Sequence, residues 1–155
     1  MKLLCAILIV LNFFIGENTL AKYSSIEEYF SVANTITIYK DGLKTEYEKD
    51  SDEFGEILLS LNSITIGARE MPAYGVSLHE ETIKEMQSGY WVELNFNKTK
   101  TYSEMPFDSL LIKVEKVWLG FDIIRGQKGV YEGRCFHLYS PTTTMENLYN
   151  TILKM

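Results

Sequence analysis

Cysteine and proline are scarce in this sequence, which has 155 residues but only two cysteines and three prolines. Cys5 lies in an N-terminal apolar segment that we expect to be removed, so Cys135 would be the one cysteine left. A single cysteine cannot form an internal disulfide, which excludes the disulfide-rich scaffolds of small secreted domains. The sequence also has no low-complexity segment, and its 13% aromatic content argues against a disordered chain.

Basic residues are outnumbered, because 15 Lys and Arg stand against 21 Asp and Glu and the formal charge is −6. Binding to phosphate backbones needs clustered Lys and Arg, so we do not expect nucleic acid as a partner. Sequence signatures of phosphate loops, dinucleotide-binding folds, zinc fingers and serine-hydrolase elbows are all missing. We therefore predict no cofactor and no bound metal.

The longest apolar run lies at the N-terminus, where Lys2 is followed by Leu3–Ile15. This run is shorter than the roughly 20 apolar residues of a membrane-spanning helix. With the small residues of Thr19–Ala21 it fits a secretory signal peptide cleaved after its last alanine; a short anchor or a buried helix is the alternative. We predict a signal peptide over 1–21, a single domain over 22–155, and a secreted or extracytoplasmic protein with no other membrane contact.

Turn signals and hydrophobic alternation predict an α+β fold. Asp41-Gly42 separates two alternating runs, 35–40 and 43–47, which indicates a hairpin that pairs Ile38 with Thr45. The other predicted elements are helices at 24–33, 52–62, 79–87 and 143–153, strands at 64–66, 90–96 and 109–115, and a turn at 97–100. Without strand–helix–strand alternation, we expect an antiparallel sheet, made of this N-terminal hairpin and a four-stranded C-terminal meander, with helices packed on one face.

The densest apolar run of the remaining chain falls in Val117–Tyr139, where Gly126–Gly129 separates two strand-like stretches. An even number of loop residues places Cys135 and His137 on the same face as Asp122, whereas an odd number places them on the opposite face. We favour the even number, because it groups the larger apolar residues of both strands on one face. The pairs then expected are Ile123 with Glu132, Phe121 with Arg134 and Leu119 with Phe136.

Cys135 and His137 form the one Cys-x-His pair, a spacing that points two side chains of a strand to the same face. A thiol nucleophile needs an imidazole within about 3 Å, which is strained when the Cβ atoms lie roughly 7 Å apart. A zinc site would need more ligands, and His79 is the other histidine. A small enzyme that uses Cys135 with His137 or His79 is our alternative function, and a buried inert cysteine is the simpler interpretation.

Arginines and a histidine near loops are the remaining candidates. Arg69 and His79 flank the segment 71–78, and Arg125 and Arg134 lie in the C-terminal hairpin, where arginine could bind a carboxylate through two hydrogen bonds. Surface or cross-strand ion pairing is the simpler interpretation of these residues. The predicted ligand-binding residues are Arg69, His79, Arg125, Arg134, Cys135 and His137, and none is predicted to be catalytic. The leading hypothesis is an exported, non-catalytic binding domain for an unknown protein or a small anionic ligand.

Three blocks of the sequence, Gly67–Glu81, Ser103–Leu111 and Tyr131–Phe136, resemble small bacterial proteins that carry no assigned function. The resemblance covers much of 35–153. It implies a bacterial origin, and it implies neither an activity nor any site residue.

Overall fold

A computed structural model describes residues 25–72 and 75–155, so the predicted signal peptide lies outside the described residues. The helices are η1 (Ile26–Val32), a 3₁₀ helix, and α2 (Asp52–Thr65), α3 (His79–Glu85) and α4 (Glu146–Lys154). The strands are β1 (Thr35–Lys40), β2 (Leu43–Glu48), β3 (Arg69–Met71), β4 (Val76–Ser77), β5 (Tyr90–Tyr102), β6 (Met105–Val114), β7 (Phe121–Gln127), β8 (Val130–Tyr131), β9 (Gly133–Arg134) and β10 (Phe136–Tyr139).

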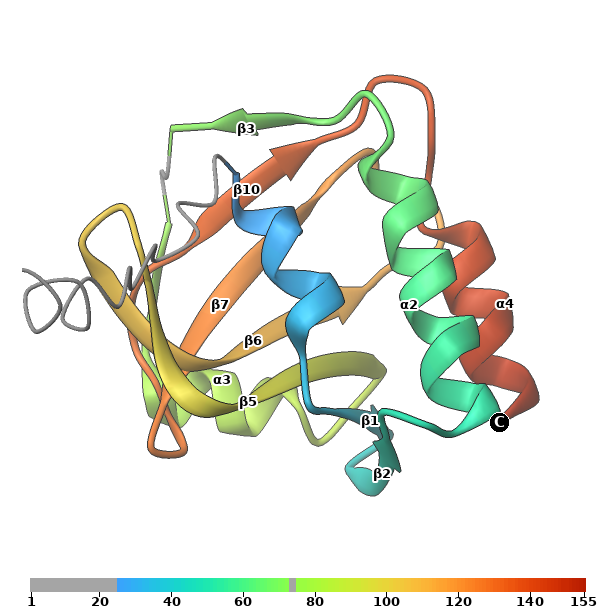
Figure 1. Ribbon diagram of the computed structural model, residues 1–155, viewed down its shortest axis with the longest axis horizontal. Helices are drawn as coiled ribbons and strands as arrows, with labels where there is room; N and C mark the ends of the chain where they lie inside the picture. The colour runs from blue at the N-terminus through green and yellow to red at the C-terminus, as the bar shows by residue number, and fades with distance from the viewer. Residues whose placement is uncertain (1–24, 73–74) are drawn as a thin grey trace, which may run out of the picture.

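The strands form an eight-stranded antiparallel sheet in the order β2-β1-β5-β6-β7-β10-β3, with β8 paired to β7 (Figure 1). The remaining strands, β4 and β9, pair with each other. The predicted α+β class and antiparallel sheet are confirmed, and β5, β6, β7 and β10 are the expected meander. The N-terminal hairpin joins this meander through β1 and β5, where Ile38 lies opposite Val92.

An apolar cluster covers each face of the sheet. On the first face, the buried residues of η1, α2 and α4 pack against alternate residues of the strands, and Figure 1 shows α2 and α4 side by side. The second face carries a smaller cluster of Met86, Trp91, Leu111 and Tyr131, and Met86 ends α3 on this side. Because alternate residues of a strand point to opposite faces, β5 supplies both clusters.

The N-terminal hairpin has the predicted register. Ile38 lies opposite Thr45, and Lys40 lies opposite Leu43. Both central turn residues have a positive φ, 50° at Asp41 and 80° at Gly42, as the tight turns of hairpins require. Local turn chemistry therefore fixes this register.

Helix α2 begins where the sequence predicts it and ends later. The Phe54 amide donates a 3.1 Å hydrogen bond to Ser51 Oγ, which caps the first turn. The helix continues to Thr65, so the predicted strand at 64–66 is wrong. Ile64 is fully buried and extends the helical stripe of the core, and this burial outweighs the strand preference of the β-branched residues around it.

The β5–β6 hairpin is longer than predicted, and the predicted turn at 97–100 is wrong. Strand β5 runs through these polar residues to Tyr102, with an irregularity between Asn95 and Lys100. A local bulge of this kind keeps two strands paired while it changes their twist. The turn lies instead at Ser103-Glu104, whose φ values are 48° and 63°.

The C-terminal hairpin has an even, two-residue loop at Lys128-Gly129, since Gln127 lies opposite Val130. The individual strand pairs that we expected are wrong, because the turn comes later and the segment β9 leaves the sheet to pair with β4. The observed pairs are Phe136 with Ile123, His137 with Asp122 and Leu138 with Phe121. The predicted face is nevertheless correct for His137, because both shifts preserve the alternation.

Two short strands occupy the segment predicted as a loop before α3. Strand β3 pairs with β10 at one edge of the sheet, and β4 pairs with β9. Leu78 is the N-cap of α3 and makes no side-chain cap hydrogen bond. The neighbouring Ser77 hydroxyl donates to the Gly133 carbonyl at 3.2 Å, and it thereby holds β4 against β9.

Candidate functional site

The six residues predicted from sequence do not form one site, although Arg125 contacts the Arg134 carbonyl and lies near Cys135. Arg69 is exposed on the edge strand β3, opposite Tyr139. Arg134 is exposed on β9 and lines a shallow cavity of about 410 Å³ together with Glu70 and Phe136. A shared anion site formed by both arginines would require them to line the same cavity, and the structure places Arg69 outside this lining.

Arg125 is tied to the backbone of its own hairpin. Its Nε donates to the Arg134 carbonyl and its Nη1 to the Pro106 carbonyl, each at 2.9 Å. Partial burial lowers the pKa of the guanidinium. The donors of Arg125 therefore hold β6, β7 and β9 together, which is a structural role.

His79 connects α3 to β8. Its Nδ1 accepts a 3.2 Å hydrogen bond from the Tyr131 amide, and its ring stacks on the Tyr131 ring with centroids 6.0 Å apart. Accepting through Nδ1 places the proton of the neutral ring on Nε2. This arrangement fixes the start of α3 against the hairpin.

Cys135 lies in the surroundings of a structural thiol. The residue is buried, and its Sγ lies 3.9 Å from the Gly133 carbonyl oxygen. Burial raises the pKa of the thiol, with the charge of Asp122 adding a smaller increase. Reactive cysteines have the opposite property, a lowered pKa and an exposed sulfur, so these surroundings disfavour a thiolate nucleophile.

His137 is paired with a carboxylate that sequence analysis did not single out as a partner. Its Nδ1 lies 2.8 Å from Asp122 Oδ1, across the neighbouring strands β10 and β7. The histidine is buried, whereas the Asp122 side chain is largely exposed. The even loop count predicted that these two residues share a face, and that was the available signal for the pair.

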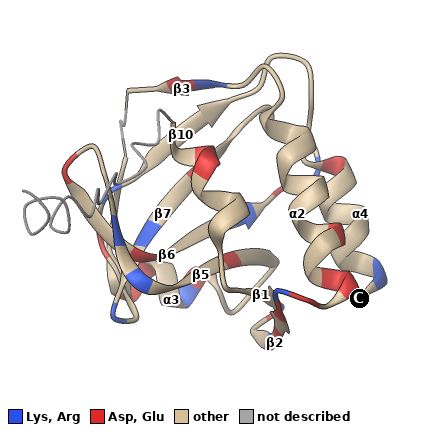
Figure 2. Cartoon of the chain, in the orientation of Figure 1, with Lys and Arg blue, Asp and Glu red and all other residues tan. Residues whose placement is uncertain are grey.

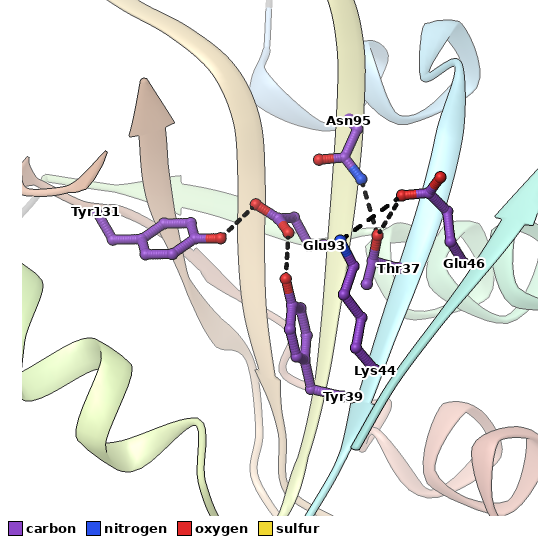
Figure 3. Close-up of polar contacts among 7 residues, drawn as sticks. All are labelled: Thr37, Tyr39, Lys44, Glu46, Glu93, Asn95 and Tyr131. Carbon is purple, nitrogen blue, oxygen red and sulfur yellow. Dashed lines mark hydrogen bonds and ion pairs between the residues drawn. The ribbon is translucent and has the colours of Figure 1, made fainter. Parts of the chain in front are cut away.

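A buried polar cluster on the second face was also missed (Figure 3). Glu93 is only 6% exposed, and its carboxylate accepts hydrogen bonds from Tyr39 Oη at 2.8 Å and Tyr131 Oη at 2.7 Å. Burial raises the pKa of both phenols, and the Glu93 charge raises it further. Each carboxylate oxygen has a donor, so Glu93 is a satisfied buried acid and its arrangement resembles a structural network.

A second set of polar contacts lies nearer the edge of the sheet. Asn95 Nδ2 donates to Thr37 Oγ1 at 3.0 Å, and Thr37 Oγ1 donates to Glu46 at 3.4 Å. Lys44 lies 3.9 Å from the same Glu46 oxygen. Polar side chains thus cover this part of the second face.

A cavity of about 260 Å³ opens beside the second-face cluster, and we call it the Trp118 pocket; its lining also includes Phe121 and Met145 of the first-face cluster. It lies where the end of α3, the beginnings of β5 and β7 and the end of β6 meet the loop that follows β6. Its apolar wall is formed by Trp91, Trp118, Phe121, Ile124 and Met145. Its charged residues are Glu85, Lys113, Glu115 and Asp122. The charged residues are those of a surface rim, whereas Trp91 and Phe121 are buried.

Lys113 is the basic residue of this pocket, and its ammonium contacts both acidic and aromatic side chains. Its ammonium lies 3.4 Å from Glu85 Oε2 and 3.7 Å from Glu115 Oε1, and 5.5 Å from the centroid of the Trp91 ring. An ammonium over the face of an indole is attracted by the ring electrons, and the two carboxylates add to that attraction. The pocket therefore already combines aromatic and acidic contacts around one positive charge.

The loop at the mouth of the pocket is apolar and exposed, and we call Val117–Leu119 the 117–119 loop. Val117 is 81% exposed, Trp118 54% and Leu119 44%. The sequence predicted that this run belongs to the core hairpin, which is wrong, since β7 begins at Phe121. Gly120 joins this loop to β7; its φ is 102°, and a Cβ there would collide with the Leu138 carbonyl, so the position requires glycine.

Comparisons with protein-family models, with curated proteins and with solved structures find no match to this chain. Within residues 25–72 and 75–155, no group of three or more His, Cys, Asp and Glu side chains is placed to hold a metal ion. In the same part of the chain, none of the helices is both long enough and apolar enough to span a bilayer. Figure 2 shows Lys and Arg dispersed among Asp and Glu along the chain.

Proposed function

We propose that this chain is an exported binding domain that holds a partner protein at the Trp118 pocket and the 117–119 loop, without catalysing a reaction. The observation that carries this proposal is the run of three exposed apolar side chains beside a cavity. Exposed apolar residues that lie together mark interaction surfaces, and tryptophan is enriched among the residues that dominate binding energy.

The size of the cavity supports a protein partner. Pockets for small molecules have volumes of roughly 300–1,000 Å³, and the Trp118 pocket has about 260 Å³. A cavity of this size fits one inserted side chain. The 117–119 loop then supplies the apolar contact around that side chain, and such a contact excludes water from the inserted group.

The buried reactive groups support a role without catalysis. Burial raises the pKa of the Cys135 thiol, and both oxygens of the Glu93 carboxylate are held by phenols. A nucleophile or a general base needs a free, accessible atom to act on a substrate.

The N-terminal sequence supports export. The apolar segment that ends in Thr19–Ala21 has the length and composition of a cleaved signal peptide. Mass spectrometry of the protein made from the full-length sequence tests this: a chain that begins at Lys22 outside the cytoplasm is expected. A chain that retains residues 1–21 would contradict cleavage.

Peptide selection tests the binding surface itself. A random peptide library displayed on phage is selected on the mature domain, and the enriched peptides are measured against Trp118→Ala. We expect about a 30-fold loss of affinity, the size of a central interface residue. Leu59→Ala is the matched control, because Leu59 is an exposed apolar residue on α2. Peptides that bind both variants equally, or a selection without enrichment, would refute the proposal.

A further inference from the structure

We infer that the partner inserts a lysine or arginine side chain into the Trp118 pocket, an inference that rests on the proposed binding function. Three carboxylates line this small cavity, those of Glu85, Glu115 and Asp122. One cation, Lys113, lies among them. The pocket therefore keeps an excess of negative charge, which a cationic group of the partner complements.

The internal contacts of Lys113 show the geometry that the pocket offers to a cation. The ammonium lies over the Trp91 ring, between two glutamates. Trp118 and Asp122 provide an indole and a carboxylate on another part of the lining, and both are more than half exposed. Asp122 Oδ1 lies 2.8 Å from His137 Nδ1, so its Oδ2 is the oxygen left for a second cation. A second cation in this part of the lining would meet one indole and one carboxylate, the kinds of group that Lys113 contacts.

The apolar wall suits the rest of a basic side chain. Lysine and arginine bury their methylene stems against apolar surface while the charged end stays near water. In this pocket Phe121 and Ile124 lie in the wall, and three of the four charged residues of the lining are carboxylates. A partner carboxylate or phosphate would instead meet like charges, which disfavour binding.

Calorimetry with one selected peptide and its variants tests the inference. The basic residue of the peptide is replaced by norleucine, which keeps the stem and removes the charge, and by glutamate. Partly exposed cation–π and ion-pair contacts predict a loss of roughly two- to tenfold for norleucine, and a larger loss for glutamate. Norleucine peptides that bind as tightly through Trp118 would overturn the inference and leave the proposed function standing. Selected peptides without a required basic residue would overturn it in the same way. Failure to obtain any Trp118-dependent peptide would overturn both.

Removing the internal cation gives the sharpest second test. Lys113→Met keeps an apolar stem on Trp91 and leaves Glu85 and Glu115 without their neutralising partner. We expect the basic peptide to bind Lys113→Met roughly two- to fivefold more tightly, and the norleucine peptide to bind unchanged. Lys116→Met is the control, since Lys116 pairs with Glu146 at 3.3 Å and is not part of the pocket lining. Weaker binding of the basic peptide to a folded Lys113→Met protein would overturn the inference.

Removing a negative charge from the pocket should have the opposite effect on affinity. Glu115→Gln removes one negative charge from the pocket, and we expect the basic peptide to lose roughly two- to fivefold in affinity at low salt. Glu53→Gln, an acid in the first turn of α2, should leave the affinity unchanged. Equal effects of the two variants would show that overall charge alone attracts the peptide, which would also overturn the inference.

Discussion

At the residue scale, the hydrogen bonds from Tyr39 and Tyr131 to the buried Glu93 carboxylate stabilise the fold, so their removal should be measurable. Tyr131→Phe removes the 2.7 Å hydrogen bond and leaves one oxygen of a buried carboxylate without its donor. We expect the free energy of unfolding to fall by about 1–3 kcal/mol, the usual cost of an unsatisfied buried polar group. Urea denaturation measures it. Tyr139→Phe, at an exposed position of β10, is the control and should change stability by less than about 0.5 kcal/mol. Equal losses would contradict the role of the network.

The same phenols predict a dependence of stability on pH. Their pKa values are raised in the folded chain, by burial and by the charge of Glu93. The stability that they contribute is therefore complete below the unfolded pKa of about 10 and is lost as the pH rises above it. Urea denaturation between pH 8 and 11 should show this loss, and the loss should be smaller in the Tyr39→Phe/Tyr131→Phe protein. Parallel curves for the two proteins would refute the assignment.

The reactivity of Cys135 distinguishes the proposed binding function from the alternative, a thiol enzyme. Because burial raises its pKa, the native thiol should react with iodoacetamide far more slowly at neutral pH than the unfolded chain does. Mass spectrometry of timed samples gives both rates. Fast native labelling that His137→Ala or His79→Ala abolishes would support the enzyme instead.

At the element scale, the three hairpin turns differ in how well their residues suit a positive φ. Asp41-Gly42 and Lys128-Gly129 place glycine second, whereas Ser103-Glu104 places glutamate at a φ of 63°. A left-handed conformation costs a residue with a Cβ roughly 1–2 kcal/mol. Glu104→Gly should therefore raise the free energy of unfolding by about 1 kcal/mol, measured by urea denaturation. The reverse change, Gly129→Ala, has no neighbour within 4 Å of the added Cβ and should lower it by a similar amount. Changes of the same sign would contradict this account.

The elements that were predicted correctly are those that local chemistry decides. The Asp41-Gly42 turn fixes its hairpin register, and Ser51 marks the start of α2. The errors lie where distant contacts decide. Ile64 belongs to a helix because the core on the first face buries it, and the polar residues 97–100 stay in a strand because pairing with β6 resumes at Lys100, opposite Phe107. Neither neighbour can be read from the local sequence.

At the scale of the whole molecule, the candidate site was beyond reach of the sequence for the same reason. The Trp118 pocket combines α3, β5, β6, β7 and the 117–119 loop, and the apolar loop itself matched the pattern of a core strand. Of the candidates that were predicted, Arg125 donates hydrogen bonds to backbone carbonyls, and His79 accepts one from the backbone of β8. Residue type alone suggested binding at these positions, and only the tertiary contacts show that both side chains connect elements of the fold.

Photocrosslinking at position 118 tests the central claim most directly. p-Benzoylphenylalanine replaces Trp118 in cells that make and export the protein, and Leu59 in a control, since both side chains are exposed and apolar. We expect irradiation to give one adduct of defined mass at position 118, joined to a partner segment that contains lysine or arginine, and none at position 59. No adduct at position 118, or the same adducts at both positions, would contradict it.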